Sequence, residues 1–374
     1  MKEALLYERQ EEGKVRCGLC PHRCIIADGR RGSCGVRENR GGTLYSLVWG
    51  RPISMAVDPI EKKPLFHFLP GSTSLSLATV GCNLTCAHCQ NYSISQHLRD
   101  RPDSDAGPDG SADTPSGRRD LADIPGDHVE PGEVVAMAVK RRCASISYTY
   151  TEPTIYAEYA LDIMALAHQK KIANVFVTNG YMTPAFIGML KGLLDAANVD
   201  LKSSSDGFYK NICGGRVGPV KEAIALLHDA GVWVEVTTLV IPGRNDSDGD
   251  LRAVAAFLRG ISPDIPWHVS RFHPDYRLTD AGATPRETLS RARAVGREAG
   301  LKFVYAGNVP GDDGEQTLCP GCGATLIERT GFHVSQNRLK GGTCPECRTK
   351  VPGVWENRSG IWSRTSTTTT VRPE

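Results

Sequence analysis

Thirteen cysteines constrain this 374-residue chain more than any other feature. Disulfides are disfavoured in a reducing compartment, so patterned cysteines in such a chain usually bind metal. Cys143 and Cys213 stand alone and are predicted to be buried as small hydrophobic side chains. The other eleven predict three metal-binding segments, which lie in turn along the chain: Cys17, Cys20, Cys24 and Cys34; Cys82, Cys86 and Cys89; and Cys319, Cys322, Cys344 and Cys347.

The overall composition is that of a soluble globular protein. Hydrophobic residues make up 40% of the chain and charged residues 23%, and the formal net charge is +2. This balance gives no strong field that would favour nucleic acid or a membrane surface. The first residues, MKEALLYERQEEGKV, lack the apolar stretch of a signal peptide, and no run approaches the roughly 18 apolar residues of a membrane span. We therefore expect a cytoplasmic protein with no membrane partner.

From about residue 72, short apolar runs alternate with amphipathic stretches about six times, which indicates parallel strands joined by crossover helices. Because no GxGxxG turn is present, an α/β fold with a partial (β/α) barrel is favoured over a Rossmann sheet. In such barrels the chemistry lies at the C-terminal ends of the strands. The expected strands are 74–80, 144–150, 174–180, 198–202, 232–243, 266–272 and 301–307, and the expected helices include 156–170, 220–231, 250–260 and 284–300, the last opened by a Thr284–Glu287 capping box.

These patterns divide the chain into segments. Residues 1–71 form a cysteine-rich metal-binding segment, 72–308 the barrel, and 315–355 a C-terminal module. Residues 99–128 are rich in Asp, Gly, Pro and Ser and contain no aromatic side chain. Such a composition cannot bury enough apolar surface to fold alone. We therefore expect a disordered insertion at about 99–128 and a disordered tail at 356–374.

The central cysteines carry the most specific chemistry. The segment TVGCNLTCAHCQN places C-x3-C-x2-C directly after a predicted strand. Three thiolates supply three corners of a 4Fe–4S cubane, and without a fourth cysteine one iron keeps an open position, as in a catalytic metal site. That iron would chelate the amino and carboxylate groups of a methionine moiety. A three-ligand zinc site or a structural loop is the alternative.

At this point the sequence resembles a known family. CNLTCAHCQN is similar to the cluster loop of the radical S-adenosylmethionine (SAM) superfamily, with His88 where that superfamily usually has an aromatic residue. Residues 72–308 resemble pyruvate formate-lyase activating enzymes. The resemblance implies a radical SAM type of barrel that cleaves SAM reductively to a 5′-deoxyadenosyl radical. It also implies hydrogen abstraction from an unidentified protein or small-molecule substrate, and an electron donor such as flavodoxin or ferredoxin.

The same resemblance assigns further positions to SAM binding. They lie in the segments YTYTEP, VTNG, VDLK and PWHVSRFHPDY. The sequence departs from the activating enzymes at Tyr150-Thr151, where those enzymes have two glycines, and at Thr237, where they have an arginine. Taken singly, each segment also fits an ordinary turn or ion pair. The implied cofactor-binding residues are Tyr150, Glu152, Thr178, Asn179, Asp200, Lys202 and His268, and Arg271, His273 and Tyr276 are candidates for substrate contact.

The two outer cysteine groups predict separate metal sites. CPGC and CPEC, separated by 21 residues, indicate a structural zinc ribbon, with a rubredoxin-like iron site as the alternative. The N-terminal C-x2-C-x3-C-x9-C pattern fits zinc or a second iron–sulfur cluster equally well, with His22 as an alternative ligand. The ribbon region carries only a mild basic patch, which argues against nucleic acid: Arg329, Arg338, Lys340, Arg348 and Lys350.

Together with YTYTEPTIYAEY and PWHVSRFHPDY, the N-terminal pattern resembles the AmmeMemoRadiSam-system radical SAM enzymes over residues 15–355. That group is named for its association with AMMECR-type and Memo-type proteins, which are therefore the candidate partners. Two other functions stay open at the level of sequence. One is a glycyl-radical enzyme activase, and the other is a non-catalytic metal-stapled scaffold or nucleic-acid adaptor.

Overall fold

The computed structural model describes residues 1–100, 124–309 and 313–356. Most of the expected disordered insertion and nearly all of the expected tail lie outside these residues. The expected start of the insertion at residue 99 is wrong, because Arg99 and Asp100 belong to a short helix, α2 (His97–Asp100). Residues 124–128 are also described, and Ile124 is buried.

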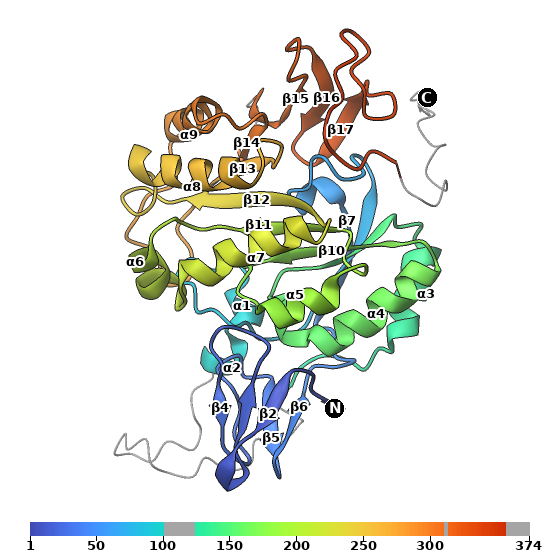
Figure 1. Ribbon diagram of the computed structural model, residues 1–374, viewed down its shortest axis with the longest axis vertical. Coiled ribbons are helices and arrows are strands. Elements are labelled where there is room, and N and C mark those ends of the chain that lie inside the picture. Colours follow the sequence, from blue (N-terminus) through green and yellow to red (C-terminus); the bar gives the residue numbers. More distant parts are fainter. Residues whose placement is uncertain (101–123, 310–312, 357–374) are drawn as a thin grey trace, which may run out of the picture.

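An eight-stranded sheet forms the centre of the molecule (Figure 1). Its order is β14-β13-β12-β11-β10-β9-β8-β7, and all neighbours from β8 to β14 are parallel. Within the described residues β7 and β14 remain the two edges, so the expected incomplete barrel is confirmed. The strands are β7 (Ser54–Pro59), β8 (Thr73–Ala78), β9 (Ser145–Tyr148), β10 (Ala173–Thr178), β11 (Ala196–Asp200), β12 (Trp233–Val240), β13 (Trp267–Arg271) and β14 (Val304–Gly307).

Strand β7 was not expected from the sequence. It pairs antiparallel with β8, and it places Asp58 opposite Ser74. The sequence segment 1–71 therefore contributes one strand to the main sheet. An antiparallel edge strand is common on otherwise parallel sheets.

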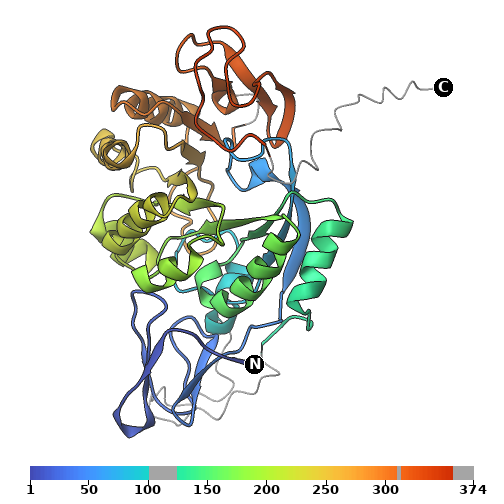
Figure 2. The same ribbon diagram turned by 45° about the vertical axis from the view of Figure 1, so that its right-hand side comes forward.

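Helices cover one face of the sheet (Figures 1 and 2). That face is apolar: Phe176 of β10 stacks on Phe186, and Trp267 of β13 packs so closely on Gly296 that an added Cβ there would lie 2.9 Å from the indole. Such burial is the main stabilising contribution to the barrel. The helices are α3 (Pro131–Lys140), α4 (Ala157–Gln169), α5 (Pro184–Leu190), α6 (Asp206–Phe208), α7 (Val217–Asp229), α8 (Asp248–Ile261) and α9 (Arg286–Glu298), and a π-helical turn, Tyr209–Cys213, follows α6.

The expected capping box at Thr284 is wrong. Helix α9 begins at Arg286, and its N-cap residue is Pro285. The Thr284 hydroxyl instead donates to the carbonyl of Val240 at 2.6 Å and accepts from the N–H of Phe272 at 2.9 Å. Tertiary contacts thus use the hydroxyl that the local pattern assigned to the helix.

The opposite face of the sheet is polar. Side chains alternate along a strand, and residues in register on neighbouring strands share a face. Ser76 of β8 donates to Asp58 of β7 at 2.7 Å, and Thr237 of β12 donates to Asn198 of β11 at 2.9 Å. A parallel sheet that is lined by hydroxyls, amides and carboxylates on its inner face is suited to a polar ligand.

Small sheets lie at the two ends of the molecule (Figures 1 and 2). Strands β1-β6-β5 and β2-β3-β4 form two three-stranded sheets in the N-terminal region, and β15-β16-β17 forms one near the C-terminus. Short helix α1 (Tyr92–Ser95) precedes α2. The remaining strands are β1 (Lys2–Glu3), β2 (Tyr7–Arg9), β3 (Val15–Cys17), β4 (Ile25–Ile26), β5 (Arg37–Arg40), β6 (Thr43–Ser46), β15 (Thr317–Leu318), β16 (Thr325–Thr330) and β17 (His333–Asn337).

The C-terminal module packs against the barrel. Arg329 donates to the carbonyl of Phe66 at 2.8 Å, and the residue is only 2% exposed. His67 lies with Nδ1 2.7 Å from the carbonyl of Pro352 and with Nε2 2.6 Å from the hydroxyl of Tyr305. Arg329 is therefore not part of a basic surface patch, contrary to expectation. None of the helices in the described ranges is both long enough and apolar enough to cross a membrane.

Candidate functional site

The three central cysteines lie in the loop that follows β8. Gly81 opens this loop with a φ of 97°, which a residue with a side chain rarely adopts. The loop is then tied to the π-helical turn, because the N–H groups of Thr85 and Ala87 donate to the carbonyls of Cys213 and Ile212, both at 2.8 Å. These bonds hold the loop at the C-terminal edge of the sheet, where the sequence predicts the chemistry.

The donor set of this loop fits an iron–sulfur cluster. The charges of Cys82, Cys86 and Cys89 interact with one another, and burial, followed by the negative charges of Glu152 and Cys86, raises the pKa of Cys82 well above its usual value. A bound metal cluster offsets the free-energy cost of ionising these buried thiols, because coordination favours the thiolate. Beside them His88 is buried, and in the described part of the chain neither of its ring nitrogens has a hydrogen-bond partner. An unpaired buried imidazole next to three soft ligands is consistent with a site that holds a further group.

Cys213 is a site residue that sequence reasoning missed. It is fully buried, as expected, but its thiol interacts with the thiol of Cys86, which lowers the pKa of Cys86 and raises that of Cys213. Nothing in the local sequence around Cys213 has metal-ligand spacing. Only the packing of the π-helical turn against the loop reveals the contact.

Glu152 joins the ends of strands β9 and β10. Its carboxylate accepts from the N–H and hydroxyl of Thr154 at 3.0 and 2.6 Å, from the hydroxyl of Thr178 at 2.7 Å, and from the N–H of Asn179 at 2.8 Å. Burial raises the pKa of Glu152, and these hydrogen bonds oppose the rise. Three donors converge on Oε1, whereas Oε2 accepts from Asn179, so Oε2 keeps capacity for a further donor.

Asn179 connects this carboxylate to the cysteine loop. Its side-chain amide donates to Oδ1 of Asn83 at 2.8 Å and lies 3.7 Å from Sγ of Cys82. The side-chain amide of Asn83 donates in turn to the carbonyl of Tyr181 at 2.8 Å. The structure thus brings Glu152, Thr178 and Asn179 together with Cys82, as the order of the motifs suggests.

Asp200 and Lys202 form an ion pair at the end of β11. The Lys202 Nζ lies 2.9 Å from Asp200 Oδ2. Burial lowers the pKa of Lys202, but the charges of Asp200 and of the Cys86 and Cys213 thiolates raise it well above its usual value. Lys202 lies two residues beyond the end of the strand, and its carbonyl accepts from the side chain of Asn245 at 2.6 Å. A fixed positive charge therefore lies near the cysteine loop.

Tyr150 shows how the chain replaces a glycine pair. Its φ of 64° is a left-handed conformation that glycine adopts freely and tyrosine rarely adopts. Its carbonyl accepts from the side chain of Asn91 at 2.8 Å, and its hydroxyl donates to Asp58. Asp58 also pairs with the buried Lys63 at 2.7 Å. These contacts with β7 and with the cysteine loop hold the strained residue in place.

His268 does not join the cysteine loop. Its Nε2 lies 2.7 Å from the buried Glu235, and its ring stacks on Tyr305 with the ring centroids 5.2 Å apart. Glu235 also accepts from the main-chain N–H groups of Phe66 and His67 at 3.0 and 2.7 Å. Within the described residues no hydrogen bond or ring contact links His268 to the cysteines, and the geometry gives it a place in the barrel floor.

The segment after β13 lies across the cysteine loop. The N–H of Arg277 donates to the carbonyl of Ala87 at 3.0 Å, and the ring of Tyr276 stacks on that of Tyr92 at 4.7 Å. His273 lies 3.3 Å from the side-chain amide of Gln90. Arg271 instead donates to the carbonyl of Thr284 at 3.0 Å. Of the three candidates for substrate contact, His273 and Tyr276 therefore border the loop.

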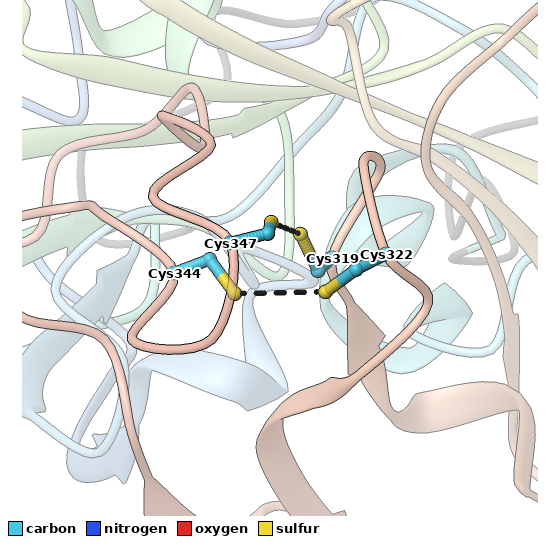
Figure 3. Close-up of side chains that lie close together, drawn as sticks. All are labelled: Cys319, Cys322, Cys344 and Cys347. Carbon is cyan, nitrogen blue, oxygen red and sulfur yellow. Dashed lines mark hydrogen bonds between the residues drawn. The ribbon is translucent and has the colours of Figure 1, made fainter.

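The four C-terminal thiols form a compact group (Figure 3). Their sulfur atoms all lie within 4.8 Å of one another, with separations of 3.5 Å for Cys319–Cys347 and 3.8 Å for Cys322–Cys344. Thiolates around one tetrahedral zinc ion stand roughly 3.8 Å apart, because each Zn–S bond is about 2.3 Å long. The geometry is therefore compatible with a zinc ribbon.

A cavity of about 740 Å³ lies elsewhere, at the N-terminal ends of β10 and β12. Residues that line it include Ala173, Asp195, Trp233 and Val354. None of the residues assigned to the cysteine loop or to SAM binding lines this cavity.

Comparison with known proteins identifies the family. Residues 76–255 match the model of the radical SAM superfamily. The chain is 44% identical to an uncharacterized protein of Methanocaldococcus jannaschii, over 94% of this chain and 99% of that protein. It is 23% identical to a pyruvate formate-lyase-activating enzyme of Clostridium pasteurianum, over 39% of this chain and 66% of that one. A radical SAM methyltransferase structure from Sphaerobacter thermophilus aligns with a TM-score of 0.47 and 17% identity, over 65% and 68% of the two chains.

The fold and the cysteine loop define an α/β enzyme of the iron–sulfur class. The chain belongs to the radical SAM superfamily. Membership implies a 4Fe–4S cluster and SAM, and the three-thiol loop with its unpaired His88 fits that pair.

Proposed function

We propose that the chain cleaves SAM at a 4Fe–4S cluster held by Cys82, Cys86 and Cys89, and that the radical so formed abstracts hydrogen from a protein or small-molecule substrate. The observation that carries the proposal is the contact of Asn179 with Cys82 and Asn83, because it joins the cysteine loop to the carboxylate of Glu152. The chemistry that such a cluster supplies is transfer of one electron to the sulfonium of SAM. That transfer breaks a C–S bond and leaves methionine and a 5′-deoxyadenosyl radical.

The chain's own residues bind and orient the cofactor. Oε2 of Glu152 would accept a hydrogen bond from the ammonium group of the methionine moiety, because among the described residues it has only one donor. Asp200 and Lys202 offer a carboxylate and an ammonium group to the ribose and the methionine carboxylate. The backbone of Tyr150 contributes to the same SAM-binding site. His268 contributes indirectly, since its contact with Glu235 holds the floor of the barrel.

We propose that the substrate binds between the polar inner face of the sheet and the segment that covers the cysteine loop. His273 and Tyr276 lie where a substrate would approach the cysteines. We propose AMMECR-type and Memo-type proteins as partners on the strength of the sequence resemblance, and an external donor of the flavodoxin or ferredoxin class as the source of electrons.

A glycyl-radical activase is the second candidate, since two relatives that match 38–39% of this chain are named as activating enzymes. Thr237 stands where the resemblance to activating enzymes predicts an arginine. It is neutral and bonded to Asn198, which supports a different substrate.

The test is anaerobic reaction of reconstituted protein with SAM and dithionite, alone and with candidate partner proteins. Formation of 5′-deoxyadenosine, measured by mass spectrometry, supports SAM cleavage, and its absence supports a non-catalytic scaffold. A stable glycyl radical in the partner, detected by electron paramagnetic resonance, would favour the activase. A modified partner peptide without such a radical would favour the first proposal.

A further inference from the structure

A second set of four cysteines lies in the N-terminal region. Cys17 ends β3, Cys20 and Cys24 belong to the turn before β4, and Cys34 lies in the loop before β5. The N–H of Cys17 donates to the carbonyl of Cys24 at 2.9 Å, which closes the turn. The charge of Cys20 interacts with the charges of the other three thiols. The four side chains therefore form one group.

The spacing of this group differs from that of the C-terminal ribbon. Over residues 1–100, 124–309 and 313–356, only the ribbon thiols form a set of three or more ligand atoms that all lie within 4.8 Å of one another. Tight spacing of this kind suits a single tetrahedral ion. In a 4Fe–4S cubane each thiolate binds its own iron, so the thiolates stand further apart. Within these residues neither the N-terminal cysteines nor Cys82, Cys86 and Cys89 form such a tight set.

The N-terminal cysteine group contacts the catalytic loop directly. His22, which lies between Cys20 and Cys24 in the sequence, places Nε2 2.7 Å from the carbonyl of Asn83. A Cβ added to Gly81 would lie 2.8 Å from the carbonyl oxygen of Cys34. The N-terminal cysteine segment is thus in van der Waals contact with the catalytic loop at Gly81 and hydrogen-bonded to it at Asn83.

Arg99 adds a third connection. Its guanidinium donates to the carbonyl of Ser33, which precedes Cys34, and to the carbonyl of Cys82 at 3.0 Å. A structural zinc staple would stabilise the small N-terminal sheets wherever it was placed. The three separate contacts instead hold the N-terminal cysteines close to the catalytic loop, and this closeness suggests a role in the chemistry of that loop.

We propose that Cys17, Cys20, Cys24 and Cys34 hold a second iron–sulfur cluster, of the 4Fe–4S type, that passes electrons to the catalytic loop. The electron relay rests on the proposed function, whereas the binding of the second cluster does not. A one-electron donor of the flavodoxin or ferredoxin class is oxidised as the N-terminal cluster is reduced. The same electron then passes to the catalytic cluster, and no atoms are transferred.

The binding test uses the full chain with Cys82, Cys86 and Cys89 changed to Ala, which removes the catalytic cluster. After anaerobic reconstitution, iron and zinc are measured and Mössbauer spectra are recorded. We expect about four irons per chain, the spectrum of a 4Fe–4S cluster, and one zinc. Two zinc ions per chain and no cluster spectrum would overturn the proposal. Because the readout needs no SAM cleavage, it is independent of the proposed function.

The relay test uses the full chain with the four N-terminal cysteines changed to Ala, and Cys143→Ala as the matched control. Dithionite is a small reductant that needs no protein docking site, so dithionite-driven SAM cleavage should persist. Cleavage driven by reduced flavodoxin should fall at least about tenfold, a change that reports loss of electron entry. If the fourfold variant is insoluble, Cys24→Ser gives the same comparison. Equal losses with both donors, or no loss with either, would overturn the relay. Absence of cleavage by the unmodified chain with dithionite would instead count against the proposed function.

Discussion

The side-chain amide of Asn179 lies 3.7 Å from Sγ of Cys82, so the end of strand β10 touches a predicted cluster ligand directly. The same residue donates its main-chain N–H to Glu152 at 2.8 Å. One asparagine therefore sets the position of the predicted SAM-binding carboxylate relative to the cysteine loop. This relationship makes the geometry of the site depend on both strands at once.

Changing Cys82, Cys86 or Cys89 to Ala should abolish dithionite-driven formation of 5′-deoxyadenosine. Each thiolate supplies one corner of the cubane, and loss of one leaves the cluster without enough ligands. Cys143→Ala is the matched control, because that residue is buried outside the three groups. The measurement is 5′-deoxyadenosine per chain together with iron content. Undiminished cleavage in all three variants would exclude the loop as the catalytic centre.

Glu152→Gln should weaken productive binding of SAM about 10- to 100-fold in kcat/KM. The carboxylate accepts four hydrogen bonds and is 1% exposed, whereas the amide group of Gln would turn a donor toward other donors. Each buried group left unpaired costs about 1–3 kcal/mol. Glu12→Gln, on the exposed surface, serves as the control. A variant with normal kinetics would show that Glu152 does not position the cofactor.

Tyr150→Phe should lower the free energy of unfolding by about 1–3 kcal/mol. The change removes the hydroxyl that donates to Asp58, and a carboxylate that also pairs with Lys62 and Lys63 then loses one partner. The control is Tyr7→Phe, whose hydroxyl bonds to Glu3 on the surface. Urea unfolding of both variants supplies the comparison, and equal effects would mean that the Tyr150 hydroxyl carries no special role.

The parts of the site that the sequence predicts are those encoded locally. The cysteine loop follows β8 because the spacing C-x3-C-x2-C and the apolar run before it are adjacent in the sequence. Alternation of strands and helices predicts the incomplete barrel for the same reason. Thr178 ends β10 and Glu152 lies in the turn after β9, so the common C-terminal edge of the parallel sheet brings them together.

The missed features depend on contacts between distant segments. The sequence of β7 ends in Pro59 and gives no strong strand pattern, so the edge strand appears only through its pairing with β8. The approach of Cys213 to Cys86 requires the π-helical turn. His268 has the expected position at β13, but the buried carboxylate of Glu235 on the neighbouring strand engages its ring. Propensity and periodicity carry no information about such partners.

Cys344→Ser should remove about one zinc per chain and release the C-terminal module. The thiol is 1% exposed and belongs to the four-sulfur group, so a structural ion would lose a ligand. We expect faster proteolysis at residues 315–355 in the variant, while SAM cleavage, measured before any loss of protein, stays near that of the unmodified chain. Zinc content equal to that of a Cys143→Ser control would contradict a zinc ribbon.

Acid should loosen the contact between the barrel floor and the C-terminal module through His67. Burial lowers the pKa of His67 from 6.5 to about 4, against the opposing charge of Glu235. Between these values the unfolded chain binds a proton that the folded chain does not, so the stabilising contribution is present above pH 6.5 and is lost as the pH falls toward 4. From near pH 7 to near pH 5 the loss should be roughly 2 kcal/mol.

His67→Gln tests this directly, because the amide can replace the hydrogen bonds to Pro352 and Tyr305 but does not titrate in this range. The free energy of unfolding in urea, measured for both proteins near pH 7 and near pH 5, should fall by roughly 2 kcal/mol more in the unmodified chain. All other titrating groups are shared, so they cancel in the difference between the two proteins. If both proteins lost the same stability, the imidazole would be titrating alike in the folded and unfolded states, and its buried position beside Pro352 would not govern the acid response.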